Sequence, residues 1–144
     1  MELSTYYKIF IFTFLFSLFT WELWVSYGVV KGDSVKIRYD KNSLKNAIIM
    51  SFGDALVIVL IVYICVLVFK ENAFKDTKTF VLFYILCNFQ NIIVSILLKK
   101  RIINQDISIA PLIPIKSKYS LLQLQEPWLL FPLIIYPLIS NSYL

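Results

Sequence analysis

Residues 47–69 read AIIMSFGDALVIVLIVYICVLVF, and Asp54 is the only charged residue among them. A helix needs roughly 20 apolar residues to cross the hydrocarbon core of a bilayer, so this run predicts a membrane-spanning helix. The composition of the 144-residue chain agrees with that prediction. Hydrophobic residues make up 59% of it and charged residues 16%, against roughly 45–50% and about 25% in soluble globular domains. We therefore predict an all-α integral membrane protein.

Three further apolar runs accompany this one, and together they give four predicted spans, at residues 9–30, 47–69, 79–98 and 121–140. No small-residue cleavage site follows the first run, which favours a retained helix over a cleaved secretory signal. Proline interrupts the last run at three positions, so we expect a kinked crossing there, with a re-entrant hairpin as the alternative. The chain is thus predicted to be a single polytopic membrane domain, a bundle of four transmembrane helices.

Two basic loops, at residues 31–46 and 99–120, connect these spans. In the first loop, a turn signal at Gly32 and Asp33 lies between alternating apolar and polar residues. This pattern predicts a short hairpin at the membrane surface or an irregular loop, and it favours neither. In the second loop, the apolar segment 107–115 is too short to cross and contains two prolines. We expect it to lie at the interface or to pack on the bundle.

The distribution of basic residues predicts the orientation. The two loops hold ten of the fourteen Lys and Arg residues in the chain, and cytoplasmic loops of membrane proteins are enriched in these residues. We therefore predict that both loops are cytoplasmic and that the N- and C-termini lie outside. The same bias accounts for the net charge of +5, so we expect no nucleic-acid partner.

Each predicted span contains strongly polar side chains in its cytoplasmic half. With a rise of about 1.5 Å per residue, they lie roughly 8–15 Å from the cytoplasmic ends of their helices. An Asp at the centre of a membrane helix costs about 2.5–3.5 kcal/mol, so such side chains should face protein or water rather than lipid. We predict a polar layer inside the bundle, formed by Glu22, Asp54, Asn88, Asn91, Gln123 and Glu126, and a basic cap over it, formed by Arg38, Lys99, Lys100 and Arg101.

The members of this layer have different expected roles. Asn88 and Asn91 favour interhelical hydrogen bonding, which fixes helix register. Glu22 and Asp54 are more costly to bury, and the sequence favours a structural and a functional role equally. Glu126 is expected to stabilise a helix N-terminus, because it precedes a proline at a helix-start pattern.

The three tryptophans, Trp21, Trp24 and Trp128, are typical of membrane interfaces and helix packing. A stacking platform for a cationic or aromatic ligand is the alternative interpretation of these residues.

The chain contains no His, which excludes a histidine-based triad, a histidine zinc site and a histidine-ligated haem. Cys65 and Cys87 lie inside apolar runs, so we predict small buried hydrophobic residues rather than a disulfide. No P-loop, dinucleotide fingerprint or paired-acid motif for a diphosphate occurs. We therefore expect no catalytic residue, no metal site and no cofactor.

These observations favour a non-catalytic accessory or assembly subunit of a membrane complex, in contact with the lipid bilayer and with a protein partner or further copies of itself. The alternative is a small proton- or cation-coupled carrier that uses Glu22 and Asp54 within the membrane. A membrane enzyme acting on lipid or prenyl groups ranks third, because that chemistry needs paired acids around a metal-bound diphosphate.

Overall fold

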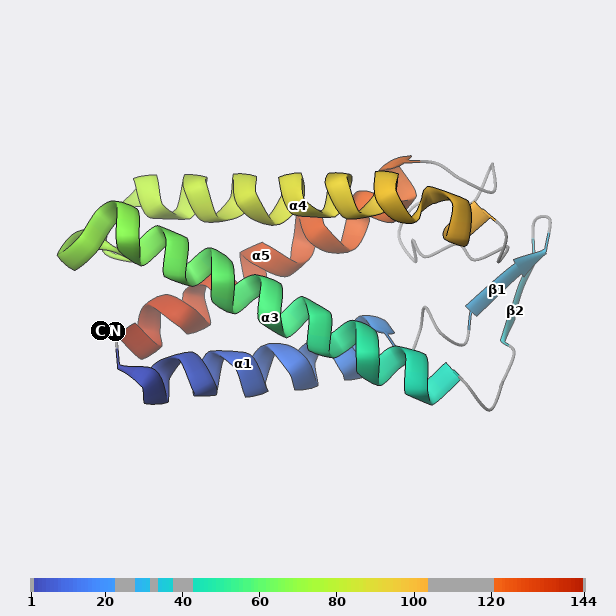
Figure 1. Ribbon diagram of the computed structural model, residues 1–144, viewed down its shortest axis with the longest axis horizontal. Helices are drawn as coiled ribbons and strands as arrows, with labels where there is room; N and C mark the ends of the chain where they lie inside the picture. The colour runs from blue at the N-terminus through green and yellow to red at the C-terminus, as the bar shows by residue number, and fades with distance from the viewer. Residues whose placement is uncertain (1, 23–27, 32–33, 38–42, 104–120, 144) are drawn as a thin grey trace.

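The computed structural model describes residues 2–22, 28–31, 34–37, 43–103 and 121–143. Four long helices make up most of this part of the chain, and two short strands form a hairpin (Figure 1). The elements in chain order are α1 (Leu3–Ser17), continued by the π-helical turn η1 (Leu18–Glu22), β1 (Gly28–Lys31), β2 (Ser34–Ile37), α3 (Ser43–Phe69), the short 3-10 helix η2 (Lys70–Asn72), α4 (Thr77–Ile103) and α5 (Leu121–Tyr143).

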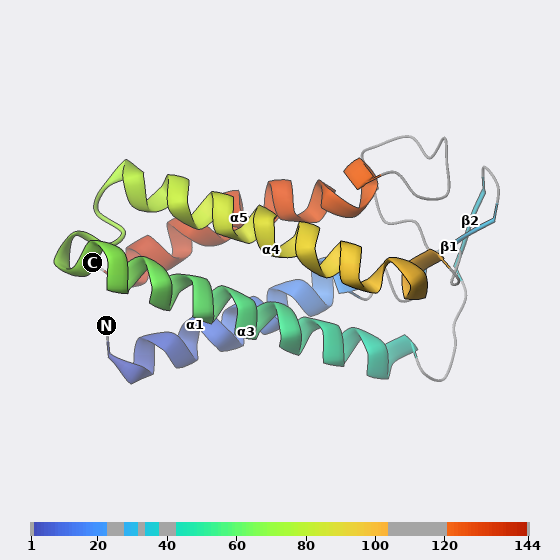
Figure 2. The same ribbon diagram turned by 45° about the horizontal axis from the view of Figure 1, so that its top comes forward.

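The four long helices lie side by side along the long axis of the molecule (Figures 1 and 2). The start of α1, the end of α5 and the turn between α3 and α4 lie at one end, and the β1–β2 hairpin lies at the other (Figure 1). α1 packs mainly against α3, and α4 packs mainly against α5. Because α3 also contacts α4, the bundle consists of two helix pairs joined through these two helices.

Among the residues that the structure describes, two helices are long and apolar enough to cross a membrane by length and composition. They cover Leu3–Thr20 and Ala47–Asn72, and a third apolar helical stretch, Trp128–Asn141, is shorter. The predicted spans 47–69 and 121–140 both lie within single helices, α3 and α5. α5 runs without a break through its three prolines, so it does not fold back as the re-entrant alternative requires.

The predicted first span, residues 9–30, is wrong at both ends. Helical structure begins at Leu3 and ends at Glu22. Residues 28–30 belong to β1, which pairs antiparallel with β2 so that Gly28 lies opposite Ile37. The valines of this strand are β-branched and suit a pleated backbone, while apolar character alone cannot separate a strand from a helix end. Of the two structures predicted for this loop, a hairpin and an irregular loop, the hairpin is observed. Its turn at 32–33 lies outside the described residues.

The third helix ends later than predicted. The basic residues 99–101 were expected to belong to the loop 99–120, but α4 continues to Ile103. Lys and Arg are good helix formers, and their long side chains extend to a polar region while the backbone stays helical. A basic run therefore indicates where a helix leaves apolar surroundings, not where its hydrogen bonding stops.

A tight turn joins α3 to α4. Lys70 (φ 51°) and Phe74 (φ 62°) both adopt the left-handed conformation, which commonly ends helices. Asp76 then caps α4, because its Oδ1 accepts a hydrogen bond from the Lys78 backbone N–H at 3.3 Å and its carbonyl accepts one from Thr79 at 3.0 Å. The Phe74 side chain is buried, so the turn is anchored to the core.

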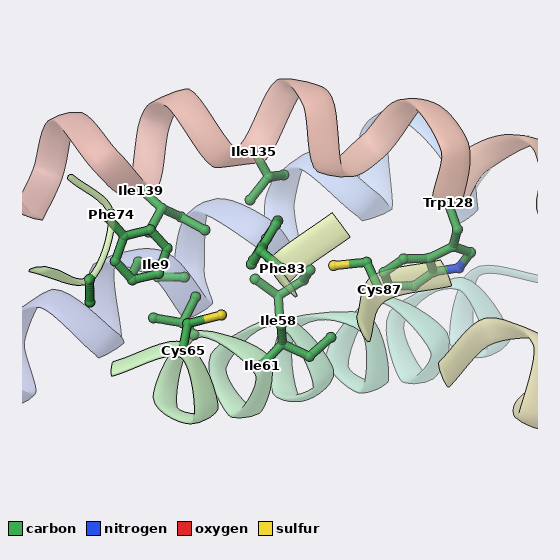
Figure 3. Packing of buried hydrophobic residues seen from close by; sticks show 12 residues of the cluster. Ile9, Ile58, Ile61, Cys65, Phe74, Phe83, Cys87, Trp128, Ile135 and Ile139 are labelled. Atoms are coloured by element: carbon green, nitrogen blue, oxygen red, sulfur yellow. The ribbon is translucent and has the colours of Figure 1, made fainter. Parts of the chain in front are cut away.

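The hydrophobic core lies where the four helices meet (Figure 3). Its members come from all four helices and from the α3–α4 turn: Ile9, Ile58, Ile61, Val62, Cys65, Ala73, Phe74, Phe83, Cys87, Trp128, Ile135 and Ile139. Cys65 and Cys87 are buried free thiols, which confirms the prediction made for both.

Candidate functional site

Small side chains form part of the contact between α1 and α3, beside the ring pair Phe10–Phe52. Thr13 and Ser17 are buried on α1, and Ala47, Ser51 and Ala55 are buried on α3. Both sets repeat every four residues, so each forms a stripe along one helix face. Small residues let two helix backbones approach closely, which is how helices associate in a membrane. We call these five residues the small-residue seam.

Asp54 lies beside this seam and is held by a residue of the other helix. The Ser17 hydroxyl donates a hydrogen bond to Asp54 Oδ2. Ser17 is 2% exposed, while Asp54 is partly exposed. A hydrogen bond to a charged group is stronger than one between neutral groups, so this contact fixes both the carboxylate and the register of α1 against α3.

A pocket of about 150 Å³ opens next to Asp54. Three helices and η1 contribute to its walls, through Phe16, Ser17, Thr20, Asp54, Trp128, Leu130, Phe131 and Ile134. Its aromatic residues contact one another: the Phe16 and Phe131 ring centroids are 5.3 Å apart, and those of Trp128 and Phe131 are 5.6 Å apart. Among the described residues, the wall of this pocket is apolar and aromatic and includes the carboxylate of Asp54.

The polar residues of α4 bond differently. The Asn88 side-chain amide donates to the Tyr84 carbonyl one turn earlier at 3.0 Å, and Asn91 is buried. Tyr84 also provides a link between helices, because its hydroxyl donates to the Leu129 carbonyl of α5 at 3.0 Å. Sequence reasoning missed this link, since a tyrosine in an apolar span gives no signal for the helix it contacts.

The remaining predicted site residues are placed by their backbone only. Glu22 ends η1, Gln123 and Glu126 lie in the first turns of α5, and Lys99, Lys100 and Arg101 lie in the last turns of α4. These helix ends lie toward the hairpin end of the molecule (Figure 1). Their side chains, together with Arg38, Trp24 and the segment 107–115, lie outside the described residues. The polar layer and its basic cap as a whole therefore stay a prediction.

Two residues of the site could have been found in the sequence. Thr13 and Ser17 are small polar residues in the Phe-rich second half of α1, and they are four positions apart. That spacing indicates a packing face. The pocket could not have been found, because it depends on which helices are neighbours.

The site offers few ligands for a metal ion. Within the described ranges, no three His, Cys, Asp or Glu side chains gather closely enough to hold one. Both hydroxyls at the pocket already act as donors, Ser17 to Asp54 and Thr20 to the Phe16 carbonyl. The described residues of the site thus provide one carboxylate, that of Asp54, and an aromatic wall.

No family model matches the chain, and no curated protein or solved structure is significantly similar to it.

Proposed function

We propose that this chain is an integral membrane protein whose four long helices cross the bilayer, and that it serves as a non-catalytic accessory or assembly subunit of a membrane complex. The observation that carries the membrane assignment is the outer surface of the helices. Large apolar side chains are exposed at four-residue intervals along α3, at Phe52, Leu56 and Leu60, although the opposite face of the same helix is buried. A helix that is apolar on all sides belongs in a membrane or a large core.

The helix lengths support four crossings. With about 1.5 Å per residue, α3 and α4 extend roughly 40 Å and α5 roughly 35 Å, against about 30 Å for the hydrocarbon core. α1 and η1 together reach about 30 Å. α3 and α4 are thus long enough to cross with tilt or to extend beyond the bilayer.

The position of the chain ends supports an even number of crossings. The start of α1 and the end of α5 lie at the same end of the bundle (Figure 1). The opposite end holds the hairpin and the last turns of α4, which contain Lys99, Lys100 and Arg101. With positive residues on the cytoplasmic side, the hairpin end is cytoplasmic and both termini lie outside.

The accessory role draws its support from how the interior polar groups are used. Ser17 bonds to Asp54 between α1 and α3, and Tyr84 bonds to the Leu129 backbone between α4 and α5. Such contacts fix helix register. A rigid, register-fixed bundle with apolar outer faces suits a subunit that packs against other membrane segments.

Co-purification in mild detergent tests this role. The tagged chain, produced at native level in its own host, is expected to elute with a partner at fixed stoichiometry. Asp54→Asn and Glu22→Gln should keep yield and partner, because Asn still accepts the Ser17 hydrogen bond and Gln keeps the shape of Glu. Asp54→Leu and Glu22→Ala should lower both. Elution of the wild-type chain alone, or only with copies of itself, would contradict an accessory subunit.

A small proton- or cation-coupled carrier is the second candidate, and Asp54 is the observation in its favour. A carboxylate at membrane depth that lines a pocket is a common ion or proton site. In that case Asp54→Asn would abolish transport while yield and assembly stay normal. That outcome separates the carrier from the accessory subunit, because Asp54→Asn should leave the function of an accessory subunit unchanged.

A further inference from the structure

We propose that the β1–β2 hairpin binds the anionic surface of the cytoplasmic leaflet of the bilayer. One face of the hairpin lies at the boundary of the hydrocarbon region, and the lysines of the other face lie at the level of the lipid phosphates. This interaction rests on the membrane orientation given in the proposed function, but it does not depend on the accessory role. It follows from the register of the two strands, from what they contact and from the charge around them.

The pairing register gives the hairpin two different faces. Gly28 pairs with Ile37, and Val30 pairs with Val35. Paired residues of an antiparallel ladder share a face, and successive residues of a strand alternate between faces. One face therefore holds Gly28, Val30, Val35 and Ile37, and the other holds Val29, Lys31, Ser34 and Lys36. Within the two strands, both charged residues thus fall on one face and the opposite face is apolar.

A hairpin of this size needs an apolar surface to pack against. Two strands alone are at best marginally stable in water. The strands contact each other extensively, and none of the described helices contacts either strand to a comparable extent. The hairpin lies at the end of the bundle (Figure 1), which in the proposed orientation is the cytoplasmic end. The boundary of the bilayer is therefore the apolar surface within its reach, as it is for amphipathic segments that lie in the interface.

The charge around the hairpin selects an anionic surface. Lys31 and Lys36 occupy diagonal positions of one face, which lie roughly 7–8 Å apart in an antiparallel pair. The loop 31–46 holds five basic residues against two acidic ones, and the basic last turns of α4 lie at the same end of the molecule. Cytoplasmic leaflets carry anionic lipids, and each Lys or Arg near such a surface strengthens binding about fivefold. Lipid phosphates at this face would also offset the repulsion between the two lysines.

Hydrogen exchange of the full-length chain in lipid nanodiscs tests the proposal. The nanodiscs consist of phosphatidylcholine alone or of phosphatidylcholine mixed with anionic phosphatidylglycerol. We expect the backbone amides of β1 and β2 to exchange at least about tenfold more slowly in the anionic nanodiscs. Amides of the α3–α4 turn, at the opposite end of the molecule (Figure 1), should exchange alike in both. Equal exchange of the strand amides in the two lipids would overturn the proposal, because a contact within the chain would then support the hairpin.

Two double variants connect the effect to the lysines of the hairpin. Lys31→Gln with Lys36→Gln should reduce the difference between the two lipids about fivefold for each charge removed. Lys75→Gln with Lys78→Gln removes two exposed lysines at the opposite end of the molecule. This matched control should keep the full difference. An undiminished difference in the Lys31 and Lys36 variant would contradict binding through this face.

A second pair of variants tests the apolar face without changing charge. Val30→Thr adds a hydroxyl to the apolar face, and Val29→Thr adds one to the face of the lysines; both keep a β-branched residue that suits a strand. Only Val30→Thr should speed exchange in anionic nanodiscs, and equal effects of the two would contradict the assignment of the faces.

The outcomes also separate this proposal from the proposed function. Labelling of Ser34→Cys from outside intact cells would reject the orientation, and this proposal with it. A protected Ser34→Cys together with equal exchange in the two lipids would reject lipid binding alone. Slower exchange in anionic nanodiscs without a co-purifying partner would keep lipid binding and reject the accessory role.

Discussion

The two helix pairs of the bundle differ in what their buried faces hold. The buried residues of the small-residue seam on α1 and α3 are small, a serine hydroxyl reaches a carboxylate between these helices, and the ring pair Phe10–Phe52 lies beside them with centroids 5.2 Å apart. Between α4 and α5 the contact includes aromatic rings: Tyr136 lies 4.9 Å from Phe80 and 5.5 Å from Phe83, measured between ring centroids. The polar link between α1 and α3 is thus made by a short side chain, Ser17, and the link between α4 and α5 by a long one, Tyr84.

The tyrosine contact lies next to a proline. Pro132 lacks an N–H and cannot complete the helical hydrogen bond to the Trp128 carbonyl. Helices in membranes tolerate proline when neighbouring groups satisfy the disturbed backbone. The Tyr84 hydroxyl bonds the adjacent carbonyl, that of Leu129, and so ties α4 to α5 one residue away from this interruption.

The largest expected effect is in the aromatic contact between α4 and α5. Phe83→Ala removes a fully buried ring and leaves a cavity, which costs about 3–5 kcal/mol of unfolding free energy for a buried Phe. Phe89→Ala on the same helix is the control, because Phe89 is 57% exposed. Unfolding titrations in detergent should show a large loss only for Phe83. Similar losses for both would mean that the buried face of α4 is assigned wrongly.

The small-residue seam should lose stability when side-chain volume is added rather than removed. Ser51→Leu forces a large side chain between α1 and α3, and overpacking typically costs about 1–3 kcal/mol. Gly53→Leu is the control, since a side chain there meets open space. We expect a lower midpoint of thermal unfolding for Ser51→Leu and no decrease for Gly53→Leu. If the two variants melt alike, the backbones of α1 and α3 are not in close approach.

The sequence predicts part of this fold and less of the site. Residues 47–69 identify α3 because apolar length is a property of one segment alone. The strand at Gly28 was missed, since a few apolar residues suit a helix end as well as a strand. The importance of Asp54 follows from its cost in lipid, but its partner Ser17 depends on which helix lies beside α3. Hydropathy carries no information about neighbours, so the pocket could not be predicted either.

The smallest expected effect is at the link between α4 and α5. Tyr84→Phe removes one interhelical hydrogen bond, and such bonds in membrane proteins average about 0.6 kcal/mol. Tyr63→Phe, at a 48% exposed position of α3, is the control and should change the unfolding free energy by less. Double substitution with Phe83→Ala sharpens the comparison, because coupled neighbours deviate from additivity. If the losses of unfolding free energy in the two single variants add up exactly to the loss in the double variant, Tyr84 is not coupled to the aromatic contact between α4 and α5.

Labelling of single cysteines in intact cells tests the four crossings most directly. Cys65 and Cys87 are buried and should not react with an impermeant maleimide, so cysteines introduced at Ser4, Thr77, Ser34 and Ser117 can be measured separately. Four crossings with a cytoplasmic hairpin end predict labelling of Ser4→Cys and Thr77→Cys in intact cells, and of Ser34→Cys and Ser117→Cys only after permeabilisation. Labelling of Ser34→Cys or Ser117→Cys in intact cells would contradict this arrangement. If Ser117→Cys labels together with Thr77→Cys while Ser34→Cys stays protected, α4 does not cross.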